Sequence, residues 1–177
     1  MTKTLTIHKA DEHSNTKYLP KYATKNSACF DIRANVEGRR IKGYDEHNVE
    51  YSYNVPHYVN STNITIKPKH KMLVPTGFIF DIPEGYALLI YPRSGLSIKH
   101  GINLINNVGV IDSDYKKEVF ITLYNSSDKE YTFEDGERLC QGRLVENIDT
   151  NIVFNEDEYE DSTDNERKGG FGSTGKT

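Results

Sequence analysis

The sequence predicts an all-β protein, built as a sandwich or a barrel. Apolar and polar residues alternate in short runs, as from Val119 to Leu123, and this period of two is typical of half-buried strands. Gly, Pro, Asn and Asp interrupt the runs at short intervals, and no window holds a 3.6-residue apolar repeat. Many short strands joined by turns favour a sheet fold over a helical one.

The first part of the chain carries two strand signals separated by a polar region. Residues 5 to 7 predict a strand, and residues 10 to 27, which are mostly polar, predict a loop. Residues 28 to 34 alternate again, so the predicted strand points the Asp31 carboxylate and the Arg33 guanidinium away from the core.

Residues 35 to 62 are rich in Tyr, Asn and His and are broken by Gly38, Gly43 and Pro56. We interpret them as an insertion on the surface, in the form of a hairpin arm. Aromatic residues in a polar background are typical of protein interfaces, so a protein partner is one expectation for this insertion. A locally packed excursion explains the same composition and is the simpler interpretation.

Strand signals resume after the insertion. Pro83-Glu84-Gly85 predicts a turn, because proline fixes φ and glycine accepts a positive φ. Residues 96 to 100 predict one short helical turn, and residues 102 to 111 are apolar with three asparagines interposed. The other candidate strands are residues 64–66, 72–74, 77–82, 86–91, 119–123, 131–133, 138–145 and 152–154.

The C-terminal residues differ in composition from the rest. Residues 155 to 166 are acidic with almost no apolar side chain, so they bury too little surface to offset their ordering entropy, and we expect a mobile linker. Residues 167 to 177 are basic and rich in glycine, which predicts a mobile arm able to fold over an anionic ligand. The expected organisation is a β domain over residues 1 to 154, followed by the linker and the arm.

Length and charge limit the function classes. A chain of 177 residues predicts one domain. Hydrophobic residues make up 36% and the mean hydropathy is −0.68, both low for a self-sufficient core. Either part of the chain is disordered or other subunits complete its apolar surface. The net charge of −4 argues against a nucleic-acid binder, because no basic stripe is present to displace phosphate counterions.

The cysteines and the N-terminus indicate the compartment. Cys29 and Cys140 lie far apart without a C-x-x-C pair, so neither a disulfide framework nor a thiolate metal site is indicated. The N-terminus lacks the apolar core of a signal peptide, and no stretch approaches transmembrane length. We therefore expect a soluble protein with no membrane contact, located in the cytoplasm, or in the host cytoplasm if it is virus-encoded.

Candidate chemistry centres on residues 109 to 115, where the carboxylates of Asp112 and Asp114 and the phenol of Tyr115 follow an apolar run. An Arg-Ser-Gly turn lies upstream at residues 93 to 95, and the glycine-rich arm lies downstream. Carboxylates that can steer a water or a metal, together with these two phosphate-compatible segments, favour chemistry on a phosphate.

Three other motifs are weaker. Residues 170 to 177 match the phosphate-loop pattern G-x-x-x-x-G-K-[ST], but an acidic segment precedes them and no helix follows, so the context of that motif is missing. A serine nucleophile built from Ser94, His100 and Asp112 lacks the G-x-S-x-G elbow. Asp112-Ser113-Asp114 resembles the start of a calcium loop without its glycine and distal glutamate, and no H-x-x-x-H pair indicates zinc.

Five stretches, in this order, resemble the five motifs of the trimeric dUTP pyrophosphatases. The segment from Pro92 to Ile102 and the run from Ile111 to Tyr115 are the most specific of the matches. The resemblance spans the chain from the first strand to the last residue, the insertion excepted. The five stretches are residues 28–34, 92–95, 109–115, 136–141 and 167–175.

The resemblance implies a distorted jelly-roll subunit that assembles as a homotrimer with active sites at subunit interfaces. It implies hydrolysis of dUTP to dUMP and pyrophosphate with Mg²⁺ as cofactor, which limits uracil in DNA and supplies dUMP for thymidylate synthesis. Shared apolar surface in such a trimer accounts for the low hydrophobic content.

The same resemblance assigns roles by motif. Asp112 would orient and deprotonate the water that attacks the α-phosphate, and Asp31 would hold water ligands of Mg²⁺. Tyr115 would lie under the deoxyribose, leaving no room for a 2′-hydroxyl. Ser94 and Gln141 would assist catalysis. The residues implied in phosphate contact are Arg93, Ser94, Gly95 and Gln141.

The remaining implied contacts involve the base and the arm. Asn106 and the backbone of Gly109, Val110 and Ile111 would read the uracil edge, with Phe120 also contacting substrate. In the arm, Phe171 would stack on uracil. The arm residues implied in closing over the phosphates are Arg167, Gly172, Ser173 and Thr174.

Two alternatives remain beside this function. One is a dCTP deaminase-like activity on the same fold, against which the run from Ile111 to Tyr115 and the stacking arm argue. The other is a regulatory protein that uses the insertion at residues 35 to 62 to bind a partner.

Overall fold

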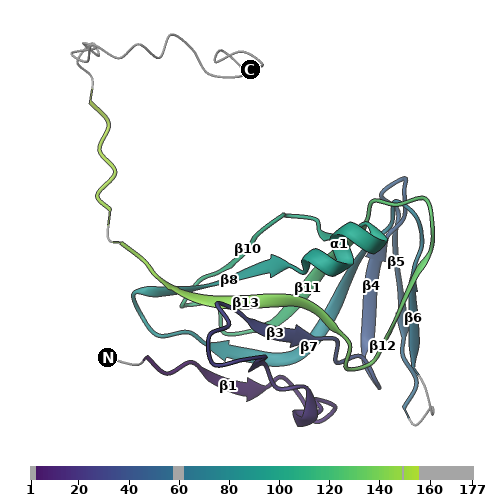
Figure 1. Ribbon diagram of the computed structural model, residues 1–177, viewed down its shortest axis with the longest axis horizontal. Coiled ribbons are helices and arrows are strands. Elements are labelled where there is room, and N and C mark those ends of the chain that lie inside the picture. The colour runs from purple at the N-terminus through teal and green to yellow at the C-terminus, as the bar shows by residue number, and fades with distance from the viewer. Residues whose placement is uncertain (1–2, 58–61, 149, 156–177) are drawn as a thin grey trace.

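The computed structural model describes residues 3–57, 62–148 and 150–155, and these residues form two packed antiparallel sheets with a small third sheet at one end (Figure 1). The all-β prediction is confirmed. A short α-helix, α1 (Ser94–His100), and one 3-10 turn, Thr16–Tyr18, lie outside the sheets. Within the described residues, no helix is long and apolar enough to cross a membrane.

The larger sheet has the strand order β5-β4-β7-β11-β9, and β1 also pairs with β7. In β11, buried and accessible residues alternate, and Val119, Ile121 and Leu123 are buried. The bounds of these strands are β1 (Thr6–Lys9), β4 (Arg40–Tyr44), β5 (Glu50–Asn54), β7 (Lys71–Asp81), β9 (Ile102–Leu104) and β11 (Glu118–Asn125).

The second sheet has the order β10-β8-β13-β3-β2, and the third sheet consists of β6 and β12. Gly142 lies in the middle of β13, where a Cβ atom would come within 2.6 Å of the Phe30 ring, so glycine permits the close packing of β3 on β13. The bounds are β2 (Lys21–Tyr22), β3 (Phe30–Arg33), β8 (Tyr86–Pro92), β10 (Gly109–Ile111), β13 (Arg138–Glu146), β6 (Asn63–Ile66) and β12 (Tyr131–Glu134).

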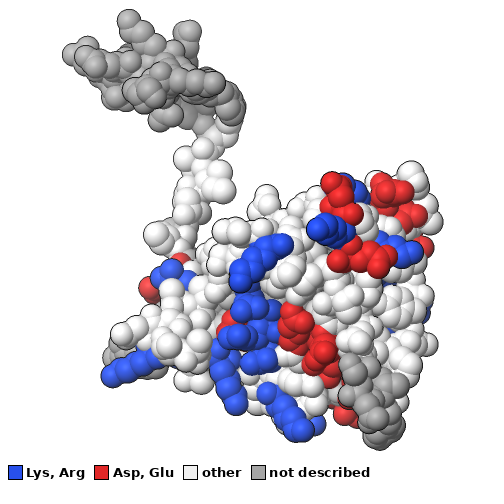
Figure 2. Space-filling model, turned by 45° about the vertical axis from the view of Figure 1, so that its right-hand side comes forward, with Lys and Arg blue, Asp and Glu red and all other residues white. Residues whose placement is uncertain are grey.

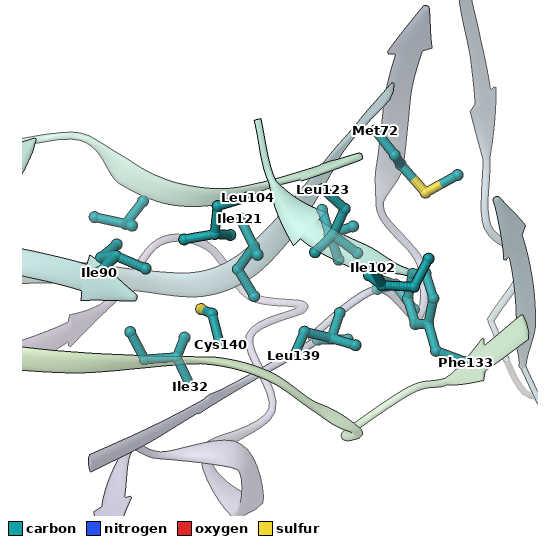
Figure 3. Packing of buried hydrophobic residues seen from close by; sticks show 14 of the residues in the cluster. Ile32, Met72, Ile90, Ile102, Leu104, Ile121, Leu123, Phe133, Leu139 and Cys140 are labelled. Carbon is teal, nitrogen blue, oxygen red and sulfur yellow. The ribbon is translucent and has the colours of Figure 1, made fainter. Parts of the chain in front are cut away.

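The hydrophobic core fills the space between the two large sheets (Figure 3). Ile32 and Cys140 come from the second sheet and face Ile121 of the first, and all three are at most 1% exposed. The Phe133 ring, fully buried, extends the core toward the third sheet. Burial of this apolar set is the main force that holds the layers together.

The described part of the insertion at residues 35 to 62 contains a hairpin, as predicted, but this hairpin belongs to the main sheet. Its first strand, β4, pairs with β7 over Lys42 to Tyr44, and β5 pairs with β4. Val36, Ile41 and Val55 are buried in the core. The segment is therefore a packed extension of the sheet, in agreement with the simpler of the two interpretations, and the expected protein partner stays a prediction.

Three local predictions were wrong. Residues 72–74 and 77–81 belong to one strand, β7, which continues through Pro75 and Gly77 because extra residues of β7 bulge out opposite Glu118 to Phe120 of β11, and Ile82 lies just beyond its end. Residues 152–154 form no strand and are exposed, since no neighbouring strand of the described chain pairs with them. The short strand β2 lies in the predicted loop.

The predicted linker beyond residue 155 and the predicted arm at residues 167 to 177 lie outside the described residues. The same holds for the roles expected of Arg167, Phe171, Gly172, Ser173 and Thr174.

Candidate active site

A pocket of about 300 Å³ opens beside the C-terminal end of β10 and contains much of the predicted site. Asp112 and Tyr115 enter it from the turn after β10, and Phe120 and Thr122 enter it from β11. The lining is mixed, with carboxylate, hydroxyl and aromatic groups set among aliphatic side chains. The full lining is Leu73, Val110, Ile111, Asp112, Tyr115, Val119, Phe120 and Thr122.

The turn after β10 is closed by local hydrogen bonds. The Tyr115 backbone N–H donates to the Asp112 carbonyl at 3.2 Å, and the Tyr115 hydroxyl donates to the Glu118 carbonyl at 3.0 Å. The Asp112 side chain is exposed, and its carboxylate accepts no hydrogen bond from the part of the chain that the structure describes. The turn therefore fixes the Tyr115 ring and leaves the Asp112 oxygens available to a water molecule.

Asn106 and Gly109 lie next to this pocket without lining it. Thr122 Oγ1, a pocket group, donates to Asn106 Oδ1 at 3.1 Å, which ties the asparagine amide to the pocket wall. A Cβ atom on Gly109 would come within 3.3 Å of Ile90, so a larger residue would press on β8. Because β10 stands at the end of its sheet, its other backbone edge is open to a flat ligand such as a base.

A second group of predicted residues meets farther along the sheet that contains β10, across β8, β13 and β3. Gln141 stands opposite Asp31 on one side and Tyr91 on the other. The Gln141 Nε2 donates to the Pro92 carbonyl at 3.1 Å, which holds its side chain beside the start of α1. Ser94 and Gly95 are the first residues of that helix, and a Cβ atom on Gly95 would meet nothing within 4 Å, so this surface faces open space.

Guanidinium groups surround the Asp31 carboxylate. Arg138 Nη1 lies 3.1 Å from Asp31 Oδ2, and Arg93 Nε lies 3.7 Å from Asp31 Oδ1. Arg33 stands opposite Arg138 in the β3–β13 pairing. Figure 2 shows one face of the molecule on which Lys and Arg side chains gather in a band beside acidic ones. Guanidinium groups next to one carboxylate form an anion-compatible surface.

Sequence reasoning missed Arg33 and Arg138 as members of this group. Both lie in stretches that carried the family resemblance, residues 28–34 and 136–141. The spacing of charged side chains on one face of each strand was the available signal, but the pairing of β3 with β13 was needed to see that these charges converge.

The neighbouring thiol is chemically inert. Burial raises the pKa of the Cys140 thiol well above its usual range, and the Asp31 carboxylate raises it further. A protonated thiol in the core is neither a nucleophile nor a metal ligand at neutral pH.

The two groups of residues line different surfaces. Asp31, Arg93, Ser94, Gly95 and Gln141 do not line the pocket that holds Asp112 and Tyr115. One chain therefore presents the pocket beside β10 and, separately, a cationic surface.

The donor set limits how a metal could bind. Within the residues described, no three His, Cys, Asp or Glu side chains are placed to hold a metal ion. Asp31 is one carboxylate with its side chain 18% exposed beside two guanidinium groups. Such a group fits Mg²⁺ that keeps its water ligands and is carried largely by substrate phosphates, because Mg²⁺ commonly binds through few carboxylates.

Comparison with known proteins gives a consistent result. The family model described as dUTPase matches residues 57–175. The chain is 45% identical over 157 residues to the deoxyuridine 5'-triphosphate nucleotidohydrolase of Finegoldia magna, covering 89% of this chain and 91% of the relative. It is 40% identical over 158 residues to the protein of the same name from Fusobacterium nucleatum, covering 89% and 90%.

Solved structures show the same fold. The dUTPase of Streptococcus mutans matches with a TM-score of 0.63 at 24% identity, covering 82% of this chain and 98% of that one. A mutant Staphylococcus bacteriophage 80alpha dUTPase with dUpNHpp matches with a TM-score of 0.70 at 22% identity, covering 98% and 99%. At these identities the likeness concerns the fold alone.

Proposed function

The chain belongs to the dUTPase family, and from this premise we propose that it hydrolyses dUTP to dUMP and pyrophosphate. The observation that carries the proposal is the meeting of Asp112 and Tyr115 in one pocket with Phe120 and Thr122. The pocket offers the exposed Asp112 carboxylate for proton transfer and an aromatic ring against which a sugar can lie.

The proposed step is an attack of water on the α-phosphorus. The Asp112 carboxylate accepts a proton from the water as the new oxygen–phosphorus bond forms. The bond from the α-phosphorus to the bridging oxygen breaks, and that oxygen leaves with pyrophosphate. The fixed turn places the carboxylate before the substrate arrives, so catalysis relies on positioning more than on new covalent chemistry.

The cationic surface is assigned to the phosphates. Arg93, Gln141 and the start of α1 would hold the phosphate oxygens, and Asp31 would hold water ligands of Mg²⁺. When bound, Mg²⁺ supplies positive charge to the phosphate oxygens as they gain electron density. Arg138 would keep the Asp31 carboxylate oriented.

We assign the two surfaces to one site shared between subunits of a homotrimer. The support is their separation within one chain, together with the low apolar content and the exposed apolar residues Ile152 and Phe154. Mixing inactive Asp31→Asn and Asp112→Asn subunits should restore a fraction of the activity, because some mixed sites would receive both intact residues. A site contained within one subunit would remain inactive in every mixture.

The decisive experiment measures pyrophosphate release from dUTP with Mg²⁺, using wild type and Asp112→Asn. We expect the substitution to lower kcat about 10²- to 10⁴-fold, the usual contribution of a general base. Asp114→Asn is the matched control, because Asp114 follows two residues later and does not line the pocket. A wild-type protein that makes no dUMP, or an Asp112→Asn variant with full kcat, would contradict the proposal. Ammonia release from dCTP would favour the deaminase alternative.

A further inference from the structure

A buried ion pair lies behind the nucleoside pocket. Arg39 precedes β4 and is 7% exposed, and its Nη2 pairs with the Glu118 carboxylate at the start of β11. Arg39 Nη1 also donates to Asp11 Oδ1 at 2.9 Å and to Ser14 Oγ at 3.2 Å. The pair therefore joins the N-terminal loop, the base of the β4–β5 hairpin and β11.

Glu118 connects this pair to the pocket, because its side chain belongs to the pair and its backbone carbonyl contacts a pocket residue. Its side-chain Oε1 accepts the Gly77 backbone N–H at 2.7 Å, which fixes the carboxylate against β7. Gly77 has a φ of +76°, a conformation that favours glycine. At its other end, the Glu118 backbone carbonyl accepts a hydrogen bond from the Tyr115 hydroxyl at 3.0 Å. The hydrogen bond of the Tyr115 hydroxyl thus depends on where the Glu118 backbone lies.

The backbone at the start of β11 is irregular, and the ion pair anchors it. The register of β11 against β7 shifts between Glu118 and Phe120, so the regular ladder is interrupted at this point. An irregular strand start has fewer ladder bonds, and the Glu118 side chain supplies the missing anchors through Arg39 and Gly77. Phe120, two residues on, forms part of the pocket wall.

We propose that Arg39 is a positioning residue for sugar selection, which acts by holding Glu118 so that its carbonyl fixes the Tyr115 ring under the deoxyribose. The inference rests on the proposed dUTP hydrolysis. Arg39 lies outside residues 57–175, the range matched by the family model, so this support for the pocket comes from the N-terminal part of the chain.

The test compares Arg39→Met with Arg40→Met as matched control. Arg40 is the next residue and is exposed, with its guanidinium bonded to Ser52 on the hairpin. For each protein, kcat/KM is measured for dUTP and for UTP. We expect Arg39→Met to lower the dUTP-to-UTP ratio about tenfold, equivalent to one hydrogen bond, and Arg40→Met to leave it within about twofold of wild type.

A double-mutant cycle with Tyr115→Phe tests the route of the effect. Tyr115→Phe removes the hydroxyl that donates to the Glu118 carbonyl, so it should lower the same ratio. If Arg39 acts through that bond, adding Arg39→Met to Tyr115→Phe should lower the ratio no further. Independent effects that multiply would overturn the proposed route.

Arg39→Met leaves the Glu118 charge buried without its partner, so this variant could fail to fold. The double variant Arg39→Met/Glu118→Met removes both charges, and we expect it to fold with the same reduced ratio. A folded double variant with wild-type discrimination would refute the positioning role while leaving dUTP hydrolysis intact. A wild-type protein that releases no pyrophosphate from dUTP would refute both.

Discussion

Two arginine–carboxylate clusters of the molecule differ in how far their side chains are exposed to solvent. In the first, Asp31 lies between Arg93 and Arg138, whose side chains are 28% and 44% exposed. In the second, the Arg39 and Glu118 side chains are 6% and 15% exposed. Both clusters pair arginine with a carboxylate, but only in the first cluster are the arginines accessible to a ligand.

This difference in burial determines which role each ion-pair cluster can have. In the open cluster, each guanidinium can exchange or share its contact with Asp31 for a phosphate oxygen at small desolvation cost. In the closed cluster, the buried Arg39 guanidinium is held by Glu118 and by Asp11, and removing Arg39 leaves the Glu118 charge in the protein interior without its cation. The open cluster is suited to binding, and the closed cluster is suited to holding the pocket in shape.

The largest expected effect comes from breaking the closed cluster. Arg39→Met should lower the free energy of unfolding by about 3–5 kcal/mol, because Glu118 would remain buried without its cation. Denaturant unfolding at neutral pH measures this loss. Arg138→Met, which removes a half-exposed arginine, is the control and should have a much smaller effect on stability. Equal losses in the two variants would show that burial does not separate the clusters.

The next effect concerns the open cluster and should appear in activity. Arg93→Met removes a charged donor from the proposed phosphate surface, so kcat/KM for dUTP should fall about 10- to 100-fold, as expected for one charge-assisted hydrogen bond. Steady-state kinetics measure the fall, and a normal unfolding midpoint confirms that the fold survives. An Arg93→Met protein with wild-type kcat/KM would remove this cluster from the phosphate site.

A smaller effect concerns the pH dependence of the stability to which the closed cluster contributes. Burial raises the pKa of the Glu118 carboxyl above its usual value of 4.5, and the Arg39 charge and the Gly77 N–H offset part of that rise. A carboxyl group with a raised pKa in the folded state stabilises the protein at pH values below its usual pKa. This stabilisation is lost as the pH rises through the folded-state pKa. Glu118→Gln keeps the acceptor for Gly77 and cannot titrate.

The measurement is the free energy of unfolding of wild type and Glu118→Gln at several pH values from about 4 to 7. The stability of wild type relative to the variant should decrease as pH rises across this range. A relative stability that increases with pH would mean that ion pairing with Arg39 outweighs burial in setting the pKa.

The sequence predicted the fold class for a physical reason, whereas the roles of the site residues stay predictions. Alternation in β3 and β11 reports which side of each strand is buried, and that information is local. Asp31, Asp112 and Tyr115 could be named because each lies in a stretch of recognisable order. Val36, Ile41 and Val55 were assigned to a surface insertion because their contacts with the core are made across distant strands.

The closed cluster shows what local patterns leave out. Arg39 and Glu118 are 79 positions apart, and nothing in the surrounding residues distinguishes Arg39 from the exposed Arg40 beside it. Only the pairing of β4 and β11 with β7 brings the two charges together. A buried ion pair is a property of the packed chain, so it could not be predicted from spacing.

The smallest expected effect comes from a third pair, in which both partners are exposed. Lys116 Nζ lies 2.6 Å from Asp81 Oδ1, and the side chains are 54% and 51% exposed. Lys116 follows Tyr115 directly, so this pair is an alternative anchor for the turn. Because solvent and salt screen exposed charges, Lys116→Met should change kcat/KM for dUTP by less than about twofold and leave the dUTP-to-UTP ratio unchanged. Kinetics at low and high salt test this. A Lys116→Met protein with a reduced ratio would mean that the surface pair, rather than Glu118, fixes the Tyr115 ring.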